Sequence, residues 1–81
     1  MNPQRLRWRC RRGLRELDLL LSGYLDQVYP GSTPEDQERF HLLLESPDEL
    51  LWRYFFQDQP PGDPQLAELI QRIRSAAAPH S

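Results

Sequence analysis

The 81-residue chain contains no lysine and only one cysteine, Cys10. A single cysteine cannot form an intramolecular disulfide, so the composition does not indicate a disulfide-stabilised secreted scaffold. The longest apolar runs, such as Leu19–Leu21, are far short of the roughly 20 apolar residues that a membrane-spanning helix needs. The basic N-terminus is of the kind found in mitochondrial transit peptides, but it leads directly into helical sequence. We therefore expect a cytoplasmic protein without membrane insertion.

Residues that build catalytic and metal sites are also scarce. His41 and His80 lie far apart in the sequence, and Cys10 has no second cysteine at metal-ligand spacing. A glycine-rich phosphate loop is missing, and a chain of this length forms one small core with little room for a substrate pocket. Beside several arginines, Cys10 is either a reactive thiol or a small core side chain, and we favour the core position. The sequence predicts no enzyme, no metal site and no stably bound cofactor.

Charge is distributed unevenly along the chain. Residues 1–15 hold six of the ten arginines and no acidic residue, whereas residues 16–81 hold all twelve acids and four arginines. Such segregation in a small domain indicates a surface presented to a partner. The arginines, with Trp8 among them, would also suit phosphates and a stacked base. The acidic overall pI of about 5.6 and the adjacent Glu16 and Asp18 disfavour nucleic acid. A solvated basic face is the purely structural interpretation.

Apolar spacing and proline positions predict an all-α fold, a compact bundle of four to five short helices. Gaps of three and four residues between apolar positions indicate one helix over residues 14–28, followed by three shorter helices and preceded by a helical turn near residues 5–10. We expect a single domain over residues 1–75 and a frayed tail over residues 76–81. The residues expected to be buried are Leu17, Leu21, Leu25, Phe40, Leu43, Leu44, Leu51, Phe55, Leu69 and Ile73.

Three helix starts carry proline. Thr33 precedes Pro34 and is expected to cap the helix that follows. Ser46 precedes Pro47 and has Glu49 three residues later, which predicts a capping box. The third start, at residues 63–64, follows a loop over residues 57–62.

The charge changes sign at the segment Arg11–Asp18. Gly13 is expected to turn the chain before the long helix, and Glu16 would then lie in the first helical turn, where a carboxylate complements the helix dipole. This structural interpretation accounts for the residue types. It does not account for the arginines on both sides of the glycine.

The run from Trp8 to Asp18, WRCRRGLRELD, resembles the core of the small succinate dehydrogenase assembly factors, which promote covalent flavin attachment to the flavoprotein subunit. The hallmark of that family, Arg-Gly-x-x-Glu, is matched by Arg12–Glu16. Further matches are Phe40, Leu43–Glu45 and Trp52, so the resemblance covers roughly residues 5–73. The short C-terminal tail, with few charges, departs from the family pattern.

The resemblance implies a helical assembly factor or chaperone, not an enzyme. It implies binding to the flavoprotein subunit of succinate dehydrogenase and, as often in bacteria, to that of fumarate reductase, with the FAD belonging to the partner. The residues implied to bind the partner are Trp8, Arg11, Arg12, Gly13, Arg15, Glu16 and Asp18. The alternative is a small nucleic-acid-binding or regulatory helical module that uses the same N-terminal arginine cluster.

Overall fold

The computed structural model describes residues 3–77, and every regular element in that part of the chain is helical. The prediction of an all-α fold is therefore confirmed. The elements are α1 (Pro3–Arg9), α2 (Arg15–Gln27), a short 3₁₀ helix η1 (Tyr29–Gly31), α3 (Pro34–Leu44), α4 (Asp48–Phe56) and α5 (Pro64–Ala77). The short helical turn expected near residues 5–10 is α1.

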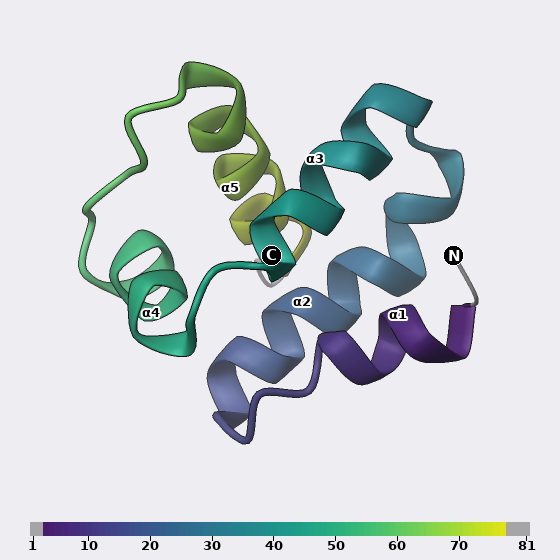
Figure 1. Cartoon of the computed structure of the whole chain (residues 1–81), viewed down its shortest axis with the longest axis horizontal. Helices are drawn as coiled ribbons and strands as arrows, with labels where there is room; N and C mark the ends of the chain where they lie inside the picture. Colours follow the sequence, from purple (N-terminus) through teal and green to yellow (C-terminus); the bar gives the residue numbers. More distant parts are fainter. Residues whose placement is uncertain (1–2, 78–81) are drawn as a thin grey trace.

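Helix α2 is the centre of the molecule, which measures 31 × 30 × 25 Å. It packs mainly against α5 and also contacts η1 and α4. Helix α1 lies alongside α2 (Figure 1), and Arg7 on α1 donates a hydrogen bond to Asp26 on α2. All ten residues predicted to be buried are in the core, together with Leu6, Cys10, Tyr24 and Ile70. The apolar face of α2 thus organises the other helices around it.

The first of the two predicted cap sites is confirmed and the second is wrong. Thr33 Oγ1 accepts the backbone N–H of Asp36 at 3.2 Å, as expected for the cap of α3. At α4 the cap position is Pro47, which stays extended at ψ 156°, so the helix begins one residue later than predicted and has no side-chain cap. Ser46 therefore lies outside the cap position, and no capping box forms.

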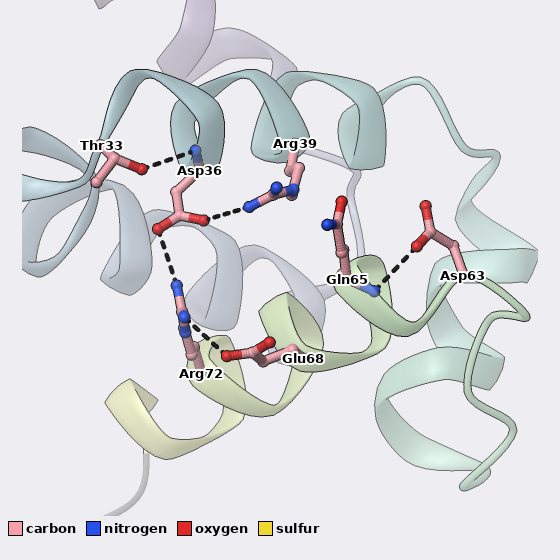
Figure 2. Close-up of polar contacts among 7 residues, drawn as sticks. All are labelled: Thr33, Asp36, Arg39, Asp63, Gln65, Glu68 and Arg72. Atoms are coloured by element: carbon pink, nitrogen blue, oxygen red, sulfur yellow. Dashed lines mark hydrogen bonds and ion pairs between the residues drawn. The ribbon is translucent and has the colours of Figure 1, made fainter.

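A carboxylate joins α3 to α5 (Figure 2). Asp36 accepts hydrogen bonds from Arg39 at 2.8 Å and from Arg72 of α5 at 2.9 Å, and Arg72 also pairs with Glu68 at 2.8 Å. Desolvation alone would raise the pKa of Asp36, but the two arginines and the Thr33 contact outweigh it and lower that pKa. These contacts link α3 to α5 through Asp36 and Arg72.

The C-terminal boundary falls slightly later than the sequence predicts. Helix α5 continues to Ala77, past residue 76, where the tail is expected to start. Residues 78–81, the rest of that expected tail, lie outside the described residues. No helix within residues 3–77 is long and apolar enough to cross a membrane.

Candidate partner-binding site

The hallmark segment forms the turn between α1 and α2. Gly13 has a φ of +78°, in the left-handed region that L side chains rarely adopt, which explains why glycine occupies the turn. The backbone N–H of Arg12 donates to the Asp18 carboxylate at 2.6 Å. Asp18 therefore stabilises the turn from the first part of α2 and is engaged within the chain. The expectation that Gly13 turns the chain here is confirmed.

Beside this turn lies a groove of about 750 Å³. Helix α1 contributes Trp8 to it, the turn contributes Arg11 and Gly13, and α2 contributes Arg15 and Leu19. Asp18 also lines the groove. Five of the seven residues implied by the resemblance are thus brought together around one concave surface, with Arg12 and Glu16 outside it.

Arg12 points into the protein, and only 15% of its side chain is exposed. Its guanidinium donates to the carbonyl of Leu44, to the carbonyl of Ser46 at 3.0 Å and to the Asp48 carboxylate at 3.0 Å. Its Nε donates to the Arg9 carbonyl at 2.9 Å. Arg12 therefore fastens the hallmark turn to the connection between α3 and α4, and its donors are used inside the chain.

Glu16 occupies the second position of α2 and is exposed. It has no hydrogen-bond or ion-pair partner within residues 3–77. The prediction that Glu16 lies in the first turn of the helix is confirmed. Its carboxylate is available to a binding partner next to the groove.

The six N-terminal arginines divide into two sets. Arg7 pairs with Asp26, and Arg9 donates a hydrogen bond to the carbonyl of His41 at 3.4 Å. Arg12 makes the buried hydrogen bonds described above, including the one to Asp48. The other three, Arg5, Arg11 and Arg15, have no partner in the described part of the chain. Half of the basic cluster thus serves the fold and half faces solvent.

Cys10 is a core residue with 1% of its surface exposed. Burial raises the pKa of its thiol from 9.0 to about 11, although Arg12, Arg7 and Arg9 act in the opposite direction. The thiol is therefore protonated at neutral pH, and the expected core position is confirmed. Across residues 3–77, no three His, Cys, Asp or Glu side chains are grouped so that they could hold a metal ion. His41 instead shares a 2.6 Å hydrogen bond with the Tyr29 hydroxyl.

The groove contains one exposed apolar residue that the sequence analysis did not assign to the site, Leu19. It is 62% exposed on α2 and lines the groove with Trp8. Leu19 falls off the apolar stripe formed by residues 14, 17, 21, 25 and 28. A leucine on the polar side of a helix is the signal that could have identified it.

Comparison with known proteins shows which family this chain belongs to. The Sdh5 family, described as "Flavinator of succinate dehydrogenase", matches residues 4–77. The FAD assembly factor SdhE of Shewanella oneidensis is 42% identical over 79 residues, covering 98% of this chain and 96% of the relative. The proteins of the same name from Pseudomonas aeruginosa and Coxiella burnetii are 41% and 31% identical and cover 94% and 93% of this chain, and 90% and 92% of their own lengths.

This chain belongs to the family of succinate dehydrogenase flavinators. The resemblance found in the hallmark segment is therefore confirmed. The relatives are named as assembly factors and not as catalysts, in agreement with the expectation that the chain is not an enzyme. No solved structure matches the chain.

Proposed function

We propose that this chain binds the flavoprotein subunit of succinate dehydrogenase and promotes covalent attachment of FAD to that subunit. Family membership supports the activity. The observation that carries the docking site is the groove at the Gly13 turn, which Arg11 and Arg15 line without a partner among residues 3–77. Glu16, the next residue after Arg15, is also exposed and has no partner in the described chain. Unpaired charges beside a concave apolar surface are what a complementary protein surface would engage.

The proposed mechanism is positioning. Covalent attachment joins a side chain of the flavoprotein to its own FAD, and a bound helper can favour the arrangement in which those two groups meet. This chain needs to supply no nucleophile, and its one thiol is buried and protonated. It also has no glycine-rich phosphate loop of the kind that cradles dinucleotides, so we assign the FAD to the partner.

The seven residues that the resemblance implies as partner-binding have two different roles in this proposal. Trp8, Arg11, Gly13, Arg15 and Glu16 contact the partner directly. Gly13 has no side chain and nothing within 4 Å of its Cβ position, so the partner's backbone can come close there. The remaining two, Arg12 and Asp18, hold the turn in shape through the contacts they make within the chain.

The proposal extends to a cytoplasmic location and to the flavoprotein of fumarate reductase as a second partner. The nucleic-acid alternative loses support, because Arg7, Arg9 and Arg12 are engaged within the chain. Only three arginines of the cluster remain to neutralise phosphates, and affinity for nucleic acid depends on that number.

Binding of purified flavoprotein subunit to Glu16→Ala tests the docking role. Glu35→Ala is a matched control, because Glu35 is also exposed, unpartnered in the described chain and second in its helix. Each change removes a first-turn carboxylate and should lower the free energy of unfolding by about 0.3–1 kcal/mol. We expect Glu16→Ala alone to weaken binding, by about 2–5 kcal/mol if its partner is left unpaired. If both variants bind the flavoprotein subunit with the same affinity as the parent chain, Glu16 has no role in docking.

A further inference from the structure

The groove beside the hallmark turn contains the two most exposed large apolar side chains of the described residues. Trp8 is 71% exposed and Leu19 is 62% exposed, and both line it. They come from different helices, α1 and α2. An apolar pair that the fold itself leaves uncovered is typical of a contact site, because covering it removes apolar surface from water. We call this surface the Trp8–Leu19 groove.

The charged side chains that line the Trp8–Leu19 groove are mostly arginines, and some of them have no partner in the described part of the chain. Arg11 and Arg15 line it without a partner among residues 3–77. Within residues 3–77, Asp18 is the only acidic residue that lines the groove, and its carboxylate already accepts the Arg12 N–H at 2.6 Å. The groove therefore offers two free guanidinium groups and one engaged carboxylate. A complementary ligand carries negative charge.

The spacing along α2 places the two kinds of contact next to each other. Arg15 and Leu19 are four residues apart, so they share one face of the helix. Trp8 lies in the last turn of α1, and Arg11 follows in the turn between α1 and α2. The groove is thus lined by two exposed apolar side chains and by two arginines that have no partner among residues 3–77. The groove has a volume of about 750 Å³, which lies within the range of concave sites that enclose a bound group.

We propose that the Trp8–Leu19 groove receives a segment of the flavoprotein subunit in which an apolar side chain is flanked by carboxylates. The apolar side chain lies between Trp8 and Leu19, and the carboxylates pair with Arg11 and Arg15. This inference rests on the proposed function and adds to it the chemistry of the recognised segment. It also adds Leu19, which lies outside the hallmark, to the residues that select the partner.

Photo-crosslinking identifies that segment directly. A photoreactive amino acid is placed at position 19 or at position 42, and each protein is irradiated with purified flavoprotein subunit. Leu42 is a matched control, because it is 55% exposed on α3 and lies outside the groove. We expect position 19 alone to crosslink, and the captured peptide to hold an apolar residue close to at least two Asp or Glu residues. Capture of a neutral or basic segment by position 19 would overturn the inference.

Binding measurements separate this inference from the proposed function. Leu19→Asp and Arg15→Glu should each weaken binding of the flavoprotein subunit by about tenfold or more, as expected for central contacts. The controls Leu42→Asp and Arg5→Glu should stay within about twofold of the parent, as expected for residues outside the contact.

Two other outcomes have distinct meanings. If Glu16→Ala abolishes binding while Leu19→Asp and Arg15→Glu bind normally, the chain still binds the flavoprotein subunit as proposed, but Arg15 is not a contact and the groove is not the recognition site. If the parent chain does not bind the flavoprotein subunit but binds a single-stranded oligonucleotide that Arg15→Glu releases, both the inference and the proposed function are wrong.

Discussion

Two adjacent residues of the hallmark, Arg12 and Gly13, have different physical tasks. Gly13 provides a backbone conformation at φ +78° and leaves open space where a side chain would stand. Arg12 provides a guanidinium that is directed away from the groove and into the protein. Loss of either residue should impair the protein, but only Gly13 belongs to the surface that a partner can touch.

Substitution of Gly13 by alanine and by arginine separates backbone strain from occlusion of the groove. Both residues are strained at φ +78°, so each variant should lose about 1–2 kcal/mol of unfolding free energy. Only Gly13→Arg adds a bulky cation next to Arg11 and Arg15, and only Gly13→Arg should lose most of the binding to the flavoprotein subunit. Thermal melts and binding assays on both variants measure this. Equal loss of binding by a folded Gly13→Ala protein would contradict the occlusion argument.

Residue types at the site could be predicted from sequence, but side-chain directions could not. Arg11, Arg12 and Arg15 all lie near Gly13 in the sequence, and nothing in their spacing shows which side chain is buried and which is exposed. The distinction comes from the carbonyls of the α3–α4 connection, more than 30 residues away, which attract Arg12 alone. The sequence shows that Leu19 lies off the apolar stripe of α2, but that it lines a groove with Trp8 depends on where α1 lies in the fold.

At the scale of elements, the α1–α2 turn and the α3–α4 connection are held together by one side chain. Arg12 serves acceptors from α1, from the connection and from the start of α4. This contact also explains why local signals gave the wrong start for α4. Ser46 was predicted to cap the helix with its hydroxyl, but it contributes its carbonyl to Arg12, a tertiary contact that periodicity and capping rules do not report. The long apolar stripe predicts a helix over residues 14–28, and α2 spans Arg15–Gln27.

Arg12→Ala should destabilise the protein more than Arg11→Ala. Hydrogen bonds that involve a charged group contribute about 1.5–3 kcal/mol, so we expect Arg12→Ala to lower the unfolding free energy by at least that amount. Arg11 has no partner in the described chain, and its replacement should change stability by less than about 0.5 kcal/mol. Denaturant unfolding of the two variants measures the difference. Equal unfolding free energies for the two variants would show that the hydrogen bonds of Arg12 do not stabilise the fold.

The Asp36 network predicts a pH dependence of stability. Its arginine partners lower the pKa of Asp36 below 3.8 in the folded chain. A carboxyl group whose folded pKa is lowered stabilises the fold above its unfolded pKa, and this contribution is lost as the pH falls through the folded value. The parent chain should therefore melt higher than Asp36→Asn near neutral pH, and the gap should narrow from about pH 4 downward. Thermal melts across this range test it, and a gap independent of pH would contradict the assignment.

For the whole molecule, the basic and acidic parts of the sequence are less separated in the folded chain than they are along the sequence. Three N-terminal arginines contact groups from the acidic part of the chain, through Asp26, His41 and Asp48. Two of the three other arginines, Arg11 and Arg15, line one groove together with exposed apolar side chains, which favours recognition of a protein segment over a long polyanion. The sequence predicts a basic surface, and the structure shows that three of its six arginines have no partner among residues 3–77.

The most direct test of the central claim is covalent flavin on the flavoprotein subunit in cells that lack this chain. In-gel flavin fluorescence is measured after the parent chain, Glu16→Ala or Glu35→Ala is returned to those cells at equal levels. The parent and Glu35→Ala should restore the fluorescent band, because both keep the docking surface. Glu16→Ala should leave the band weak although the protein is folded. A full-strength band with Glu16→Ala, or none with the parent chain, would contradict the account.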